Sequence, residues 1–84
     1  MYSLYVLKCA DGTLYTGITT DVQRRIHEHN SLKVGAKYTR VRRPVQLVFA
    51  REFADRSSAS KEEARIKKLS RAEKFVFIDS GSRA

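Results

Sequence analysis

The first half of the chain and one later segment alternate between apolar and polar positions. Tyr2 to Cys9 is rich in Tyr, Leu and Val and alternates with a period of two, which predicts a β-strand. Thr13 to Thr19 predicts the returning strand, with Ala10-Asp11-Gly12 as the turn of a β-hairpin. Val45 to Phe53 alternates well enough for a third strand, because Pro44 bars any helix from continuing into it.

The length of the hairpin loop decides whether Tyr5 and Tyr15 lie on the same face of the sheet. A two-residue loop of Asp11 and Gly12 would pair residues whose numbers sum to about 23, leaving the two rings on opposite faces. A three-residue loop with Gly12 in the left-handed conformation makes the sum about 22 and puts both rings on one face. Asp followed by Gly suits such a bulge, so we predict the three-residue loop.

A helix is predicted directly after the hairpin. Thr20-x-x-Gln23 is a capping box, so the helix should begin there and run to about Asn30. At about 100° per residue, an apolar stripe and two polar side chains share one side of this helix: Val22, Arg25, Ile26 and His29. We therefore expect Arg25 and His29 to border the surface that packs on the sheet.

Two more helices are predicted in the last third of the chain. Residues 55–58 offer several N-caps for a helix that reaches Leu69, and Ser70-x-x-Glu73 is a capping box for a short helix through Ile78. The apolar run from Phe75 to Ile78 fits a strand as well. Residues 1–79 are thus expected to form a single α+β domain, a three-stranded antiparallel sheet flanked by helices, and residues 80–84 a frayed tail.

Composition narrows the class of partner. The chain has 84 residues, which is one domain, and its 17 Lys+Arg against 9 Asp+Glu give a net charge of +8. That excess predicts a polyanionic partner, and nucleic acid rather than a membrane, because no long helix combines a lysine-rich face with a broad apolar one. We expect neither a signal segment nor a membrane span, and we interpret the single Cys9 as a buried strand residue of a cytoplasmic protein.

The basic residues are concentrated in the segment from Lys33 to Arg43, which has five cations and no acid. Unopposed cations beside Tyr38 favour phosphate contact with base stacking over a merely solvated face. The candidate nucleic-acid-binding residues are Lys33, Lys37, Tyr38, Arg40, Arg42, Arg43, Lys67 and Lys68.

The order and spacing of these features resemble the GIY-YIG nuclease superfamily, and within it a small single-domain bacterial group similar to the catalytic subunit of the Slx-type endonuclease. The matching segments are Leu4-Tyr5, Tyr15-Thr16-Gly17, Thr19-Thr20-Asp21, Arg24-Arg25, Arg25-x-x-x-His29, Gly35 to Arg40 and Glu63 to Leu69. The chain departs from the family pattern at Ser3, Leu4 and Thr16, and it lacks the asparagine or glutamine that many relatives carry in the last helix.

The resemblance implies a metal-dependent endonuclease acting on DNA rather than RNA, at branched or irregular structures, with a protein partner as a further expectation. It implies that Tyr5 and Tyr15 line the site, that Arg25 and His29 contact the scissile phosphate or the attacking water, and that Glu63 holds one Mg²⁺ or Mn²⁺. The residue chemistry agrees, because Mg²⁺ commonly takes only one or two carboxylates and a guanidinium fork matches a phosphate.

Each candidate also has a purely structural interpretation. The tyrosines could only pack on a half-buried sheet, and Arg25 and His29 could be surface residues of an amphipathic helix. Glu63 could complete a capping box with Ser60 or pair with Lys67, and helical angles put its neighbour Glu62 closer to the buried side. The alternative function is therefore a nucleic-acid-binding module of the same fold that does not cut.

Overall fold

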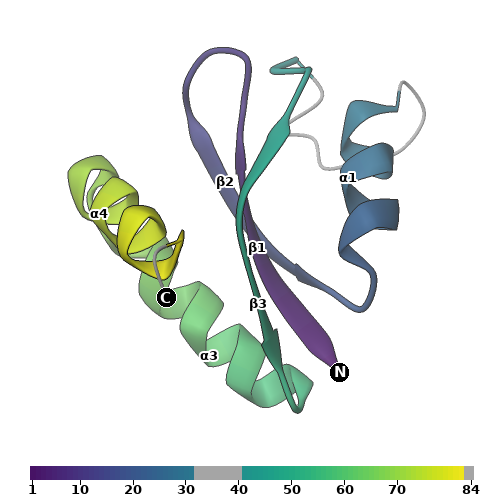
Figure 1. Cartoon of the computed structure of the whole chain (residues 1–84), viewed down its shortest axis with the longest axis vertical. Coiled ribbons are helices and arrows are strands. Elements are labelled where there is room, and N and C mark those ends of the chain that lie inside the picture. The colour runs from purple at the N-terminus through teal and green to yellow at the C-terminus, as the bar shows by residue number, and fades with distance from the viewer. Residues whose placement is uncertain (32–40, 83–84) are drawn as a thin grey trace.

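A three-stranded antiparallel sheet with the strand order β2-β1-β3 lies at the centre of the molecule (Figure 1). Its strands are β1 (Tyr2–Lys8), β2 (Leu14–Thr19) and β3 (Gln46–Phe53). These coordinates are a computed structural model that describes residues 1–31 and 41–82. The predicted α+β class and the sheet of three antiparallel strands are confirmed.

The β1–β2 hairpin has the three-residue loop that the sequence predicts. Tyr5 pairs with Gly17 and Leu7 with Tyr15, which is the register of the longer loop. Gly12 has a φ of 84°, in the left-handed region that a residue without a Cβ adopts without strain. Because Tyr5 and Leu7 are two residues apart on one strand, both tyrosine rings lie on the same face of the sheet.

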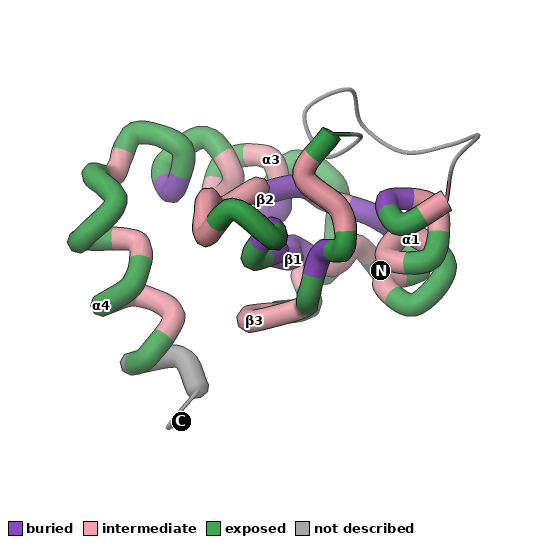
Figure 2. The backbone as a smooth tube through the Cα atoms, turned by 90° about the horizontal axis from the view of Figure 1, so that it is seen from above, coloured by how far each residue is buried: buried purple, intermediate pink, exposed green. Residues whose placement is uncertain are grey.

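The helices cover opposite faces of the sheet, as Figures 1 and 2 show. Helix α1 (Val22–Asn30) lies on one face, where Ile26 packs on the cluster that contains Tyr5. Helices α3 (Arg56–Lys67) and α4 (Arg71–Ser82) lie on the other, where Ile66 packs against Leu4 and Val6. No helix within residues 1–31 and 41–82 has the length and apolar character needed to span a membrane.

Helix α1 begins one position later than the sequence predicts. Its N-cap is Asp21, whose Oδ1 accepts from the backbone N–H of Arg24 at 3.1 Å, so the predicted Thr20-x-x-Gln23 capping box is wrong. Asp caps a helix at least as well as Thr, and its charge also complements the positive end of the helix dipole. The Oγ1 of Thr19 accepts from the backbone N–H of Asp21 at 3.1 Å and so stabilises this start.

Helices α3 and α4 follow the predicted order. Asp55 is the N-cap of α3, which ends at Lys67 rather than Leu69. The Ser70–Glu73 capping box is confirmed by two reciprocal bonds of 2.9 and 3.2 Å. Helix α4 includes Phe75 to Ile78, so the strand alternative is wrong, and it extends beyond the predicted end to Ser82.

Strand β1 is buried on both of its faces. The four residues from Leu4 to Leu7 expose at most 1% of their surface, so this central strand supplies both layers of the core. Cys9 follows the strand and is also buried, as predicted, and burial raises the pKa of its thiol. Tyr5 is thereby held between the sheet and α1.

Candidate functional site

Two tyrosines and a histidine meet between the sheet and α1. The hydroxyl of Tyr5 and Nε2 of His29 are 2.9 Å apart and share a buried hydrogen bond whose direction follows the imidazole tautomer. The ring centroids of Tyr15 and His29 are 5.1 Å apart in an edge-on arrangement, and those of Tyr5 and Tyr15 are 6.4 Å apart. Three residues that the sequence singles out are therefore brought into one cluster.

Gly17 makes room for the ring of Tyr5. A Cβ at this position would lie 2.5 Å from the Tyr5 hydroxyl oxygen and 2.7 Å from its Cζ, closer than real contacts allow. The glycine is therefore needed for space rather than for an unusual backbone conformation. The predicted hairpin register already contains this information, because it pairs Gly17 with Tyr5.

Burial sets the protonation of the Tyr5–His29 pair. His29 exposes 0% of its surface and Tyr5 only 1%. Burial, helped by the nearby charge of Arg25, lowers the pKa of His29 to about 4, so the imidazole is neutral at pH 7. Burial also raises the pKa of the Tyr5 hydroxyl above its ordinary value of 10.0, and the hydrogen bond from Arg25 opposes that rise.

The burial of His29 changes one expectation. The resemblance implies that His29 contacts the phosphate or the attacking water, but its imidazole has no exposed surface and contacts Tyr5 instead. Tyr15 and Arg25 are only partly buried, so they form the part of the cluster that faces solvent. In this structure His29 therefore lies on the buried side of the cluster and contacts the Tyr5 hydroxyl.

Arg25 is placed by α1 beside Tyr5 and is held there by an acidic neighbour. Its Nη1 donates to Oε1 of Glu28 at 2.9 Å, and about 30% of each side chain is exposed. Glu28 is not among the residues predicted from the sequence, although its spacing of three residues from Arg25 on a helix is typical of an ion pair.

The two neighbouring glutamates of α3 differ in their surroundings. The charge of Glu63 contributes to the raised pKa of Tyr5, whereas Glu62 pairs with Arg65 and lines a hollow at Phe53. Glu63 also pairs with Lys67 at 3.3 Å, as one structural interpretation predicted. The capping-box interpretation of Glu63 is wrong, because α3 begins at Arg56 and Glu63 lies in its interior.

Several of the predicted nucleic-acid-binding residues have partners within the fold. Arg42 pairs with Asp11 at 3.1 Å, and Arg43 donates from Nε to the backbone carbonyl of His29 at 2.8 Å. Lys68 is exposed at the C-cap of α3. Four predicted residues lie outside the described part of the chain: Lys33, Lys37, Tyr38 and Arg40.

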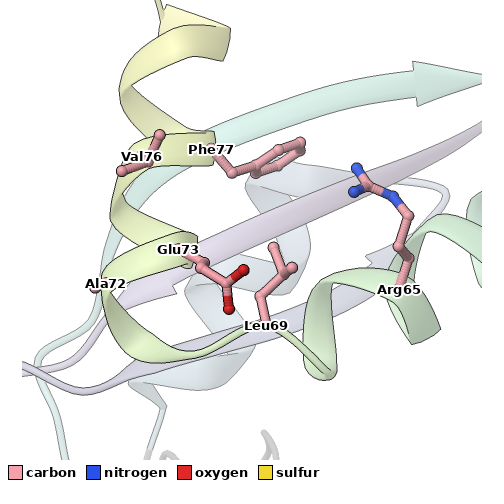
Figure 3. A pocket seen from close by; sticks show the side chains of 6 residues that line it. All are labelled: Arg65, Leu69, Ala72, Glu73, Val76 and Phe77. Atoms are coloured by element: carbon pink, nitrogen blue, oxygen red, sulfur yellow. The ribbon is translucent and has the colours of Figure 1, made fainter.

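A groove of about 390 Å³ between α3 and α4 lies apart from this chemistry (Figure 3). Its lining is mostly apolar and consists of Arg65, Leu69, Ala72, Glu73, Val76 and Phe77. None of the candidate catalytic side chains belongs to it. The candidate site is therefore the partly open aromatic cluster under α1.

The fold and the site together define a nuclease-type domain. The model of the GIY-YIG catalytic domain matches residues 1–75, and the chain belongs to this family. The GIY-YIG domain implies nuclease-type activity.

The relatives of the chain are UPF0213 proteins, a small single-domain GIY-YIG group. The chain is 54% identical to one from Desulfotalea psychrophila over 95% of this chain and 73% of that protein. It is 57% identical to one from Halobacterium salinarum over 93% of this chain and 100% of that protein.

Two solved structures have a similar fold. The solution NMR structure of EF2693 from E. faecalis has a TM-score of 0.69 and 45% identity, covering 99% of this chain and 88% of that one. The solution NMR structure of the UPF0213 protein BH0048 from Bacillus halodurans has a TM-score of 0.61 and 46% identity, covering 94% and 84%.

Nucleases of this family generally use divalent metals, so the residues of the site can be compared with that need. Among the described residues there is no group of three or more His, Cys, Asp or Glu side chains placed to hold an ion. Glu63 would be the carboxylate of such a site, and its charge contributes to the raised pKa of Tyr5. That donor set fits Mg²⁺, which keeps several waters and needs only one or two carboxylates beside the substrate phosphate.

Proposed function

We propose that this protein is a divalent-metal-dependent endonuclease of the cytoplasm that hydrolyses DNA phosphodiester bonds at branched or otherwise irregular structures, as in repair or recombination. The observation that supports it is the arrangement around one phenol: Nε2 of His29 lies 2.9 Å from the Tyr5 hydroxyl, and Arg25 hydrogen-bonds to the same side chain. A module that only binds nucleic acid needs cations but not this arrangement.

The residues have distinct roles in this proposal. The Arg25 guanidinium binds the scissile phosphate in place of Glu28 and neutralises charge that develops in the transition state. The Tyr5 hydroxyl lies beside it, takes a proton from the attacking water and passes its own proton to Nε2 of neutral His29, which also keeps the hydroxyl oriented. Tyr15 forms the exposed wall of the site. Glu63 would hold the Mg²⁺ or Mn²⁺ ion, which supplies charge neutralisation and a more acidic water when bound.

One observation favours the alternative of a binding module that does not cut. Tyr5 and His29 are buried and Arg25 already has a carboxylate partner, so the site must open to admit a phosphate. Nucleic-acid binding would then use the cations of the 33–43 segment together with Lys67 and Lys68. A protein partner that supplies specificity is part of the proposal in either case.

The test compares the native chain with Glu63→Ala and with Glu62→Ala as the matched control. Labelled branched, nicked and single-stranded DNA, with RNA of the same sequences, are incubated with Mg²⁺ or Mn²⁺. We expect metal-dependent cutting of branched DNA that is lost in Glu63→Ala, by about 100-fold or more, and retained in Glu62→Ala.

Other outcomes are equally informative. Cutting that survives in Glu63→Ala and disappears in Glu62→Ala would mean that Glu62, and not Glu63, holds the ion. Tight binding that weakens steeply with salt, without cutting by any of the three proteins, would favour the binding module.

A further inference from the structure

One side chain joins the end of α1 to the residue that precedes β3. Nδ2 of Asn30 donates to the carbonyl oxygen of Val45 at 3.3 Å, and the backbone N–H of Val45 donates to Oδ1 of Asn30 at 2.8 Å. Only one orientation of the amide satisfies both bonds, so the pair also determines how Asn30 points.

These two bonds satisfy the backbone of the residue that precedes β3. The last ladder pair between β1 and β3 is Lys8 with Gln46, and Val45 lies immediately beyond it. Val45 is buried, so its N–H and C=O need partners, and the Asn30 amide exchanges both bonds with it as a facing strand residue would. The last residue of α1 is thereby joined to the start of β3.

A third bond holds the adjacent residue. Nε of Arg43 donates to the backbone carbonyl of His29 at 2.8 Å. Carbonyls in the last turn of a helix have no partner within the helix, and a cation there also interacts favourably with the negative end of the dipole. The last turn of α1 is therefore held through the backbone of His29 and the side chain of Asn30, although none of the three bonds involves the imidazole itself.

The position of the His29 imidazole depends on the position of this last turn of α1. His29 has to meet the Tyr5 hydroxyl at 2.9 Å across the layer between α1 and β1. Tyr5 is held by pairing with Gly17 on β2 and Ala50 on β3, so its position is set by the sheet. The position of His29 is set by α1, whose middle packs on the sheet through Ile26 and whose last turn is linked to the start of β3 through Asn30 and Arg43.

We propose that Asn30 and Arg43 are positioning residues of the candidate site, which hold the last turn of α1 to the start of β3 so that His29 meets the Tyr5 hydroxyl. For catalysis this inference rests on the proposed function. Its structural part does not, because the Tyr5–His29 contact can be measured without any cleavage.

The experiment uses Asn30→Ala, which removes the bonds to Val45 without changing charge, and Arg43→Ala, which removes the bond to His29. Arg24→Ala is the matched control for the lost charge, since Arg24 is exposed on the other side of α1. Two NMR readouts are followed in the full chain: the contact between the rings of Tyr5 and His29, and the titration of His29.

We expect the Tyr5–His29 ring contact to weaken in both variants and the His29 midpoint, about 4 in the native chain, to rise toward its ordinary 6.5. Arg24→Ala should leave both unchanged. A folded Asn30→Ala with the native ring contact and midpoint would overturn the proposal. If Asn30→Ala does not fold, Asn30→Ser, whose short hydroxyl cannot make both bonds to Val45, decides in the same way.

Cleavage kinetics form the second arm. A positioning role predicts that kcat falls about tenfold or more in Asn30→Ala while KM changes by less than about twofold, because misplaced groups slow the chemical step. A change in KM alone would contradict it. If the native chain does not cut, the proposed function fails, and the NMR readouts still decide whether Asn30 and Arg43 position His29.

Discussion

The face of the sheet under α3 and α4 buries mostly aliphatic and aromatic side chains, with Thr16 opposite Val6 among them, whereas the face under α1 buries a phenol bonded to an imidazole. On the first face, Leu4, Val6 and Ile66 form a cluster joined by Phe49 and Phe77, among others. On the second, Tyr5 lies with His29, which has no exposed surface. Both faces share strand β1, and successive residues of a strand point to opposite faces of the sheet. The difference in chemistry therefore arises between neighbouring residues of β1.

This difference shows how so small a domain separates stability from chemistry. Apolar contacts need only shape and area, so the α3–α4 face can stabilise the fold without accurate placement of polar atoms. Buried polar groups need a partner for each donor or acceptor, and a lost partner costs the full desolvation of the group that remains. The α1 face is therefore the one where small displacements should affect function.

The largest expected effect is on the apolar face. Ile66 is 1% exposed, so Ile66→Ala should lower the free energy of unfolding by about 2–5 kcal/mol through lost burial and the cavity left behind. The folded fraction should keep the contact between Tyr5 and His29, since Ile66 packs on the opposite face of the sheet. Urea unfolding followed by circular dichroism measures the change, with Val76→Ala, at a position 66% exposed, as the control. A loss below about 1 kcal/mol would contradict this assignment of stability to the α3–α4 face.

The second effect is a pH dependence that comes from the polar face. The folded pKa of His29, about 4, lies below its unfolded value of about 6.5, so protons bind the unfolded state better between these values. Stability should therefore be full above pH 6.5, fall as the pH drops toward 4, and level off below that for this group. The fall attributable to His29 is at most about 3 kcal/mol.

Denaturant midpoints at pH 7, 5.5 and 4.5 measure this dependence. The slope should be absent in His29→Gln, which keeps a polar side chain near Tyr5, and retained in His27→Gln, since His27 is exposed. The same slope in both variants would show that other groups, not His29, cause the pH dependence.

The third effect concerns the steric contact between Tyr5 and Gly17. Gly17→Ala forces a Cβ against the Tyr5 ring and should cost about 1–3 kcal/mol, as overpacking does, while displacing the phenol from His29. In a Tyr5→Phe background the nearest clashing atom, the hydroxyl oxygen at 2.5 Å, is absent, so the same substitution should cost less. A double-mutant cycle by urea unfolding measures this coupling. Equal costs in the two backgrounds would mean that the hydroxyl is not what excludes a side chain at Gly17.

The sequence could predict the features that depend on local spacing. The hairpin register follows from the Asp11-Gly12 turn, and the Ser70–Glu73 cap follows from its spacing of three residues. The start of α1 was predicted one residue early, because Thr20 and Asp21 are both good caps and only the Thr19–Asp21 bond favours the second.

The features that the sequence could not predict join distant segments. Asn30 and Val45 are 15 residues apart, and no local pattern pairs them. The helical periodicity of α1 indicated the side on which His29 lies but not that its imidazole would be completely enclosed. Periodicity put Glu62 closer to the buried side of α3, and its side chain is 18% exposed against 23% for Glu63. Burial alone therefore does not select an ion ligand, and Glu63 stays a prediction.

The smallest expected effect concerns the exposed edge of the polar face. Glu28 holds Arg25 with a carboxylate where the proposal places a phosphate, so substrate and Glu28 compete for the same guanidinium. Because the pair is partly exposed, its loss is worth only about 0.2–1 kcal/mol, and Glu28→Gln should tighten DNA binding about two- to fivefold. Fluorescence anisotropy at low salt measures this change.

Removing any negative charge from the protein also strengthens DNA binding in general, so Glu52→Gln, at an exposed position of β3, is the matched control. A larger gain for Glu28→Gln locates the phosphate at Arg25, and an equal gain in both variants would mean that DNA responds only to net charge.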